Sequence, residues 1–460
     1  MTKVPKERIF QVSTKVIYLA NKFLRQALEA LSSLYAFMKG GIDMPEQSVF
    51  HLKRLLLLPD NIDMGTSKSR IDKIIQTSRV FRELYLLENQ LTPILSGMQK
   101  SGLLLSRTWL SEGLQQERLL LLAKEAEIQS YTGNDVGVTP EEKLVSFLKV
   151  EKLPEALRIA DLKKNKALHP IYAVFMQYKV TKQFIDFWGT KLERESQKDS
   201  RGELRLKGQW ASFTSFSGRI FASDLPLTSL PRGMRPYIRS EDDRCIYSLD
   251  FNQAELRFVA YYSRCEALLL LINERVDLHQ QLGNFIASQA ATTAHLTEEK
   301  ARQIGKQFLF SFLYGAGKNR LLQNLQKHLP EMTSIGVERI ANAFYTRFPA
   351  LQIFLRALEK EDTLLTPFGL VKPLAKFTQH QKRNFSFQAG VAVAIKKLMI
   401  CLHPHFEIIH VVHDELWVLA YPEDRVLLDT MINQFYEEMT VILPKFPTKG
   451  FVKIKLLGGI

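Results

Sequence analysis

Two aspartates that follow short apolar runs are the first candidates for chemistry in this sequence. Asp250 closes the run at residues 246–249, and Asp414 follows the run at residues 408–412 with His413 between them. A carboxylate at the end of a buried strand loses hydration, which is costly unless a cation compensates for it. If the two strands are neighbours, the pair could hold two Mg²⁺ ions roughly 3.5–4 Å apart and support phosphoryl transfer. Either aspartate alone is more simply explained as a turn residue.

A cationic and aromatic helix face provides the complementary groups. Residues 297–314 begin with a threonine and two glutamates, which is typical of a helix start, and we expect the helix to stop at Gly315. Four side chains recur at every fourth position and share one face, namely Arg302, Lys306, Phe310 and Tyr314. A triphosphate could lie against the two cations while its base stacks on the two rings. The alternative is an amphipathic helix with buried aromatics and solvated cations.

The composition restricts the partners and the compartment. The 460 residues carry 62 Lys and Arg against 48 Asp and Glu, and the resulting charge of +14 favours a polyanionic partner, most simply nucleic acid. A solvated basic surface would give the same charge. Three widely separated cysteines indicate a reducing compartment, so we expect a cytoplasmic protein of a bacterium or phage, with an organelle as the alternative. Apolar runs such as residues 267–272 are too short to cross a membrane, and no membrane partner is expected.

The elements around these candidates are helices mixed with short strands. Residues 88–162 have a mostly helical pattern, and residues 212–236 are punctuated by Gly, Pro and Ser, which is typical of loops. Residues 245–251 form an apolar run typical of a strand that enters a core. Residues 408–419 are apolar on both sides of a polar triplet at 413–415, which predicts a hairpin with the triplet at its turn. Strands mixed with long helices indicate the α+β class.

Five motifs resemble, in the same order, those of family A DNA polymerases. LDFNQAELR at residues 249–257 is similar to the first palm motif of that family, and VHDE at residues 412–415 is similar to the second catalytic palm motif. The basic and aromatic face of residues 302–315 resembles the fingers helix at the same spacing. Two further matches are Ser217-Gly218-Arg219 with Pro231, and Asn384-x3-Gln388-x7-Lys396. Residues 88–140 resemble the family's thumb more weakly.

The resemblance implies a right-hand polymerase fold, with thumb helices, an antiparallel-sheet palm and helical fingers, in a monomer. The implied division of the chain is an N-terminal helical extension (1–77), the thumb (78–211), the first part of the palm (212–276), the fingers (277–365) and the second part of the palm (366–460). The implied partners are primer–template DNA and deoxynucleoside triphosphates, with a processivity or repair factor of unknown identity.

The resemblance also implies a role for each matched residue. Asp250, Asp414 and the backbone carbonyl of Phe251 would bind two Mg²⁺ ions, with Mn²⁺ as an alternative, and Glu415 would be an auxiliary carboxylate. Glu255 would close the space beside the sugar 2′ position and exclude ribonucleotides. The other implied nucleotide contacts, of which Lys306 would also act in catalysis, are Gln253, His279, Arg302, Lys306, Phe310 and Tyr314. The implied DNA contacts are Arg219, Asn384, Gln388, Lys396 and His413.

Several positions depart from the family pattern. Phe251 and Asn252 replace the usual Tyr and Ser, and Leu309 and Ser311 flank the fingers aromatic in place of Asn and Gly. Residues 226–229 hold Pro, Thr and Ser where the family's template-reading side chains stand. Fewer polar groups that check the minor groove would relax discrimination against distorted base pairs.

The first 77 residues bear on proofreading. They are too few for the 3′–5′ exonuclease domain of bacterial relatives, and they contain no Asp-x-Glu pair of the kind that binds its metals. We therefore hypothesise a non-proofreading enzyme of repair, lesion bypass or specialised phage or plasmid synthesis.

Three other functions stay open on the sequence. A single-subunit RNA polymerase has related motifs, although Glu255 argues against it. A degenerate polymerase could bind primer–template junctions without catalysis, although both aspartates are intact. A terminal transferase without need of a template is the third. A zinc site is not expected, because no matching acid or cysteine set accompanies the histidines His403, His405, His410 and His413.

Overall fold

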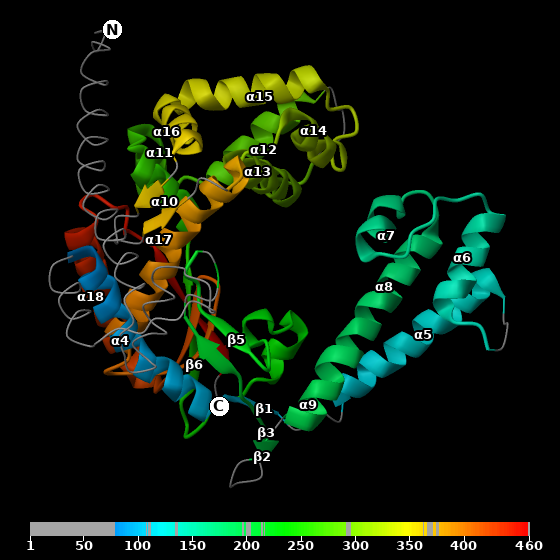
Figure 1. Ribbon diagram of the computed structural model, residues 1–460, viewed down its shortest axis with the longest axis horizontal. Helices are drawn as coiled ribbons and strands as arrows, with labels where there is room; N and C mark the ends of the chain where they lie inside the picture. The colour runs from blue at the N-terminus through cyan, green and yellow to red at the C-terminus, as the bar shows by residue number, and fades with distance from the viewer. Residues whose placement is uncertain are drawn as a thin grey trace, which may run out of the picture. The chain divides into compact units, whose positions relative to one another are not determined.

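The chain forms two compact units. The computed structural model describes residues 79–460 except 107, 109–111, 134–136, 196, 199–203, 213–214, 216, 291–295, 362, 366–370, 374–376 and 459–460. The helical extension expected over residues 1–77 lies outside the described residues. The first unit comprises residues 79–96, Ala211–Phe221 and Tyr247–Lys455 (Figure 1). The second comprises Gly97–Trp210, Ala222–Ile246 and the last described residues of the chain.

A four-stranded sheet is the centre of the first unit. Its strands are β6 (Cys245–Phe251), β9 (Glu407–Val412), β10 (Glu415–Ala420) and β11 (Val452–Gly458), in the order β11-β6-β10-β9. β9 and β10 form an antiparallel hairpin in which Val412 pairs with Glu415 and His410 with Trp417. The turn between them begins at His413, whose φ of 55° is in the left-handed region. The predicted strand and the predicted hairpin are therefore confirmed.

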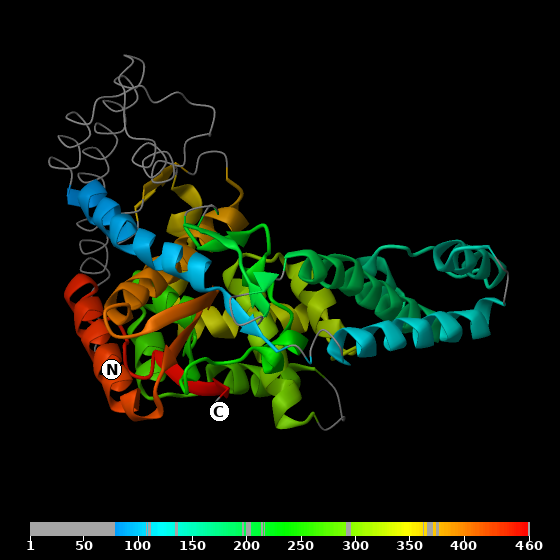
Figure 2. The same ribbon diagram turned by 90° about the horizontal axis from the view of Figure 1, so that it is seen from below.

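Long helices pack around this sheet. They are α4 (Arg79–Ser101), α10 (Ala254–Ser263), α17 (Gln379–Leu402) and α18 (Arg425–Ile442), the last preceded by the short η5 (Pro422–Asp424). α17 contacts both α10 and α18 (Figures 1 and 2). By length and composition α17 could cross a membrane, but 83% of its most apolar window is buried inside the protein. Such burial is expected of a core helix, and the sheet rests on it.

A layer of six further helices belongs to the same unit. These are α11 (Glu266–Asn273), α12 (Leu278–Gln289), α13 (Glu298–Leu313), α14 (Lys318–Gln326), α15 (Ser334–Arg347) and α16 (Pro349–Lys360). One cluster of buried apolar side chains joins them to α10 and α17. The strands β7 (Thr363–Leu365) and β8 (Val371–Pro373) form a small hairpin after α16. The helix predicted from residue 297 is confirmed as α13: Thr297 caps it by accepting the Lys300 N–H, and Gly315 follows its end with φ 87°.

α12 and α13 approach each other through two glycines. A Cβ at Gly305 would lie 2.0 Å from the His279 carbonyl oxygen, and a Cβ at Gly283 would lie 1.9 Å from the Ala301 carbonyl oxygen. No side chain fits at these distances, so the two backbones touch directly. The contact fixes the distance between His279 on α12 and the cationic face of α13.

The second unit is mostly helical. Its helices are α5 (Leu114–Thr132), α6 (Pro140–Val150), α7 (Ile159–Asn165), α8 (Pro170–Phe184), the π-helix η2 (Ile185–Gly189) and α9 (Thr190–Glu195). α5 lies beside α8, and α6 and α7 follow at one end of this pair (Figure 1). Its strands and short helices are β1 (Leu103–Leu105), β2 (Gln197–Lys198), β3 (Leu204–Leu206), β4 (Gln209–Ala211), β5 (Phe221–Ser223), η3 (Leu227–Ser229) and η4 (Arg232–Tyr237).

The second unit extends beyond the residues 78–211 expected to form the thumb, and the thumb assignment stays a prediction. Residues 222–246, expected in the palm, belong to the second unit. Two contacts explain this: Leu105 bridges to Ile238, and the Arg205 guanidinium binds both carboxylate oxygens of Glu241 at 2.6 Å. Such long-range pairs leave no local mark on the sequence.

Candidate active site

The two aspartates lie at neighbouring points of the sheet. The Phe251 N–H at the end of β6 donates to the Asp414 carbonyl oxygen at 3.0 Å. Burial raises the pKa of Asp414 to about 6, and the negative charge of Asp250 is the next cause. Glu255 acts in the same direction and the Arg219 guanidinium opposes it. The carboxylates of Asp250 and Asp414 therefore act on each other across the β6–β10 boundary.

This acidic pair is a suitable place for a divalent cation. Buried carboxylates that repel each other are stabilised by a shared cation, and carboxylate oxygens are the ligands that Mg²⁺ prefers. No cluster of three or more His, Cys, Asp and Glu side chains forms a ready-made metal centre within the described ranges. A magnesium ion held by Asp250 and Asp414 would therefore need further oxygen ligands, which a bound phosphate can supply. The Phe251 carbonyl is on the same turn.

The turn after Asp250 is held by a segment near the end of the chain. The Asn252 N–H donates to the Phe451 carbonyl at 2.7 Å, and Arg257 Nε donates to the Asn252 carbonyl at 2.9 Å. The Arg257 guanidinium also donates to the Lys449 carbonyl at 3.2 Å, and burial lowers its pKa to about 10. Gln253 completes the turn with φ 54° and precedes α10. Arg257 ends the motif at residues 249–257, but no role was predicted for it, because its backbone partners lie about two hundred residues later.

Glu255 joins two other predicted residues in one polar cluster. The Tyr314 hydroxyl donates to Glu255, and Arg219 Nη2 lies 3.4 Å from the other carboxylate oxygen of Glu255. Burial raises the pKa of Tyr314, and the charge of Glu255 raises it further. Glu255 therefore links helix α10 to the end of α13.

The cationic face of α13 is open. Arg302 and Lys306 are exposed, Phe310 and Tyr314 are half-buried, and the opposite face of the helix lies in the core. The Phe310 and Tyr314 rings are stacked with centroids 6.4 Å apart. Arg302 Nε donates to Asp277 Oδ2 at 2.6 Å, in a pair whose two side chains are more than 40% exposed. Such an exposed pair is weak and can exchange for a phosphate.

His279 differs from the other nucleotide candidates because it is buried. Its ring lies 5.8 Å from that of Phe310, and its Nδ1 has no hydrogen-bond partner among the described residues. Burial lowers the pKa of His279 to about 4, and the positive charges of Arg302 and Lys306 also lower it against the opposing effect of Asp277. At neutral pH the ring is uncharged, so it could offer an N–H to a phosphate but not a positive charge.

Three of the predicted DNA contacts line the same region. Asn384 and Gln388 are half-buried on one face of α17, and Gln388 interacts with the Tyr314 hydroxyl. The Asn384 Oδ1 is buried and has no hydrogen-bond partner within the described part of the chain. His413 is exposed at the hairpin turn, where partial burial of its ring and the charge of Arg219 lower its pKa.

Lys396 corrects one prediction. Its side chain is 0% exposed, and its Nζ lies 2.9 Å from Glu88 Oε1 in an ion pair between α17 and α4. A lysine enclosed in this way cannot reach a DNA phosphate. The residue matches the motif spacing, but the structure uses it to hold α4 against the core.

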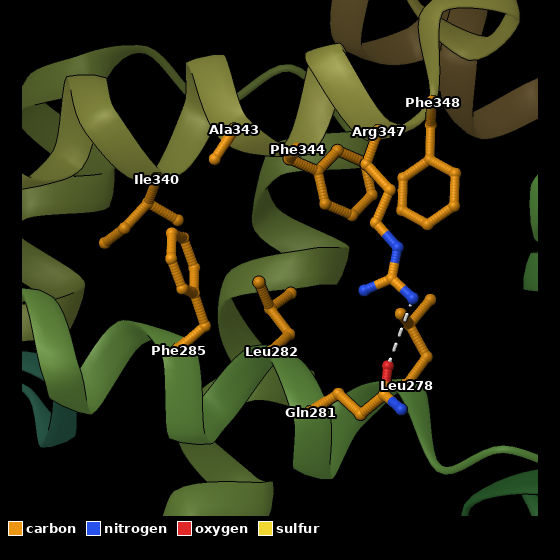
Figure 3. Close-up of a pocket in the computed structure, with 9 residues that line it drawn as sticks. All are labelled: Leu278, Gln281, Leu282, Phe285, Ile340, Ala343, Phe344, Arg347 and Phe348. Atoms are coloured by element: carbon orange, nitrogen blue, oxygen red, sulfur yellow. Dashed lines mark hydrogen bonds between the residues drawn. The ribbon is translucent and has the colours of Figure 1, made fainter. Parts of the chain in front are cut away.

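The apolar pocket of the first unit is elsewhere. It has a volume of about 150 Å³ and lies between α12 and α15 (Figure 3). Apolar side chains from both helices line it, and Arg347 at its rim donates to Gln281 at 3.4 Å. Neither aspartate and none of the predicted site residues lines this pocket. The acidic pair, and not the apolar pocket, is therefore the candidate centre of the chemistry.

Comparisons with known proteins agree with this geometry. The solved structure of the POL domain of Pol1 from M. smegmatis, in complex with DNA primer-template and dNTP, superimposes with a TM-score of 0.70. The match covers 92% of this chain and 80% of that chain at 19% sequence identity, which establishes the fold as that of a polymerase domain. The model of DNA polymerase family A matches residues 149–449, more than half of the sequence. The chain belongs to DNA polymerase family A.

Curated relatives are similar over parts of their length. DNA polymerase I of Helicobacter pylori (strain ATCC 700392 / 26695) is 24% identical over 289 residues, which are 60% of this chain and 30% of the relative. Thermostable DNA polymerase I of Thermus aquaticus is 24% identical over 384 residues, which are 75% of this chain and 44% of the relative. The chain thus spans less than half the length of either relative. The family and the α+β right-hand polymerase class inferred from the motifs are confirmed.

Proposed function

We propose that this protein is a DNA-directed DNA polymerase that extends a primer by two-metal phosphoryl transfer. The observation that carries the proposal is the electrostatic repulsion between Asp250 and Asp414, which raises the pKa of Asp414. The two residues are 164 positions apart in the sequence (414 − 250), and they meet where β6 ends and β10 begins. Primer–template DNA and deoxynucleoside triphosphates are the proposed partners, because a protein of the same fold is described in complex with both.

The residues of this chain would divide the work as follows. Asp250 and Asp414 would hold two Mg²⁺ ions, which when bound activate the primer 3′-hydroxyl and neutralise the leaving pyrophosphate. Arg302 and Lys306 would bind the triphosphate from the open face of α13. Phe310 would stack on the incoming base next to Tyr314.

Glu255 would set the sugar preference. Its carboxylate is held by Tyr314 and Arg219, so it cannot swing aside without loss of both contacts. A fixed carboxyl group beside the 2′ position would exclude a hydroxyl there by contact and by competition for hydrogen bonds. This role favours a DNA polymerase over a single-subunit RNA polymerase.

For the biological role we propose non-proofreading synthesis in repair, lesion bypass or specialised replication in the cytoplasm. The support is the unusual set of residues at 226–229. Of these, Thr228 is buried in the second unit, where it could not read a template base. Excision of a mismatched primer end by the purified protein would contradict the non-proofreading part.

A primer-extension assay tests the proposal. Purified protein is given Mg²⁺, a labelled primer with or without a template strand, and each nucleotide type singly. Templated addition of the complementary deoxynucleotide is expected. Extension without a template would indicate a terminal transferase, preference for ribonucleotides an RNA polymerase, and duplex binding without extension a degenerate polymerase. A templated abasic site in the same assay tests lesion bypass.

A further inference from the structure

The carboxylate of Glu415 is engaged by two donors inside the sheet. Ser248 Oγ donates to Glu415 Oε1 at 2.7 Å, and Trp417 Nε1 donates to the same oxygen at 2.9 Å. Ser248 and Trp417 are each 1% exposed. Hydrogen bonds to an ionised acceptor are stronger than neutral ones, and they gain further where water is excluded. Glu415 is therefore fixed by both strands before any ligand arrives.

The bonds of Glu415 lie directly beside the two aspartates. Ser248 is two residues before Asp250 on β6, so both side chains point to the same face of the sheet. Glu415 is the residue after Asp414. The Phe251–Asp414 backbone bond and the Ser248–Glu415 side-chain bond thus cross the same strand boundary, the first at Asp414 itself and the second at the next residue.

The ring of Trp417 is held in place by its neighbour on β9. Its ring packs against that of His410, its cross-strand partner on β9, with centroids 4.6 Å apart. The indole is completely enclosed, so its N–H has a single direction in which to point. The hydrogen bond to Glu415 is consequently set by the packing of the hairpin.

We propose that Glu415, Ser248 and Trp417 form a clamp that sets the separation of Asp250 and Asp414, so that Glu415 acts as a positioning residue. The proposal rests on the polymerase function proposed above. A cation bound to Oε1 would face two donor hydrogens that already point at this oxygen and repel positive charge. The clamp leaves the metal-binding work to the two aspartates.

The clamp matters because two-metal catalysis is sensitive to small displacements of the ligands. A site held about 0.5 Å or more away from its productive geometry loses rate while still binding its substrate. Loosening the clamp should therefore lower kcat and leave the KM for the nucleotide nearly unchanged.

The first test compares two replacements of Glu415. Glu415→Gln keeps an oxygen acceptor for both donors and loses the charge, whereas Glu415→Ala loses the acceptor. A positioning role predicts kcat within about threefold of wild type for Gln, and a fall of about thirtyfold for Ala. A metal ligand would behave differently: Gln and Ala would both lose activity and both would need more Mg²⁺ for half-maximal rate. That second result would overturn the proposal.

The second test removes the donors. Ser248→Ala and Trp417→Phe should each lower kcat by about tenfold in the wild-type background and have no further effect in the Glu415→Ala background. Ser386→Ala and Trp188→Phe are matched controls, because both residues are buried and Ser386 donates only within α17. Equal losses from the donor variants in both backgrounds would show that they act independently of Glu415, against the proposal.

A third readout does not need catalysis. The chain has four tryptophans, so a ¹⁵N-indole NMR spectrum has four signals, and Trp417→Phe identifies one of them. That signal should move upfield in Glu415→Ala and stay near its place in Glu415→Gln, while Mn²⁺ binding followed by EPR persists in both. If the chemical shift of the Trp417 indole does not change in Glu415→Ala, the clamp is refuted, even if the enzyme is active. An enzyme that extends no primer but shows the shift would refute the proposed function alone.

Discussion

The acidic and cationic sides of the candidate active site are built in opposite ways. Asp414 is held by the backbone contact with Phe251 and lies in a desolvated environment, whereas Arg302 and Lys306 project from α13 into solvent. A buried charge requires fixed surroundings because misplacement is costly at low dielectric, while an exposed cation loses little by moving. The acids are thus organised in advance, and the cations are free to adapt to a phosphate.

The largest effect should come from the organised side. Asp414→Ala removes one of the two proposed metal ligands and should lower kcat at least about a thousandfold, with duplex binding retained. Single-turnover extension and fluorescence anisotropy on a primer–template measure the two quantities. Asp429→Ala on α18 is the control, since Asp429 forms an exposed i,i+4 pair with Arg425 of the same helix. An Asp414→Ala enzyme that extends normally would refute the site.

Two lysines give the next contrast. Lys396→Met should cost about 3–5 kcal/mol of unfolding free energy, because it leaves Glu88 as an uncompensated buried charge. Lys306→Met should change stability by less than about 0.5 kcal/mol and raise the KM for the nucleotide about tenfold. Denaturant titration and steady-state kinetics provide the comparison. The division between fixed and adaptable cations would be wrong if Lys306→Met lowered the unfolding free energy and Lys396→Met changed only the KM for the nucleotide.

A pH titration of stability without divalent ions tests how strongly the folded state disfavours the ionised form of Asp414. The folded-state pKa of Asp414, about 6, is above its ordinary value of 3.8, so the folded state prefers the protonated form. Its contribution to stability is therefore present at low pH and is lost as pH rises from about 4 to 6. Asp414→Asn should match wild type near pH 4 and exceed it by up to about 3 kcal/mol at pH 8.

The difference between the variant and wild type is the measured quantity, so other titrating groups cancel. A flat profile for Asp414→Asn would mean that neither burial nor the charge of Asp250 raises the pKa of Asp414.

The smallest effect concerns the helix pair that carries the cations. Gly305→Ala should destabilise the protein by about 1–3 kcal/mol, since the added Cβ would lie 2.0 Å from the His279 carbonyl oxygen. Gly97→Ala in α4 meets nothing within 4 Å and should be neutral or slightly stabilising. Thermal unfolding measures both. If Gly305→Ala is tolerated as well as Gly97→Ala, the backbones of α12 and α13 are far enough apart at Gly305 to admit a Cβ.

The sequence predicted the local parts of this site. The four-residue spacing from Arg302 to Tyr314 predicts a shared helix face, and α13 has that face. The apolar runs before Asp250 and Asp414 predict strands, and both exist as β6 and β9. Period and capping are properties of neighbouring residues, so a single sequence contains them.

The non-local parts could not be derived in this way. The adjacency of β6 and β10 followed only from the family resemblance, because no pattern near residue 250 specifies a partner near 414. The burial of Lys396 depends on Glu88, which is 308 positions away. The hydrogen bonds of Glu415 depend on Ser248 and Trp417, which in the sequence are an ordinary strand serine and an ordinary strand tryptophan.

The contact between the Asp250 turn and residues 447–451 has a consequence for synthesis of the chain. Phe451 and the carbonyls bound by Arg257 emerge from the ribosome about two hundred residues after Asp250, and β11 follows them. The strand that carries Asp250 therefore lacks its edge neighbour until residues 452–458 have been synthesised. We expect nascent or truncated chains that stop before residue 447 to lack the contacts that hold the turn after Asp250. Such chains should not bind metal at this site, even if their helices form.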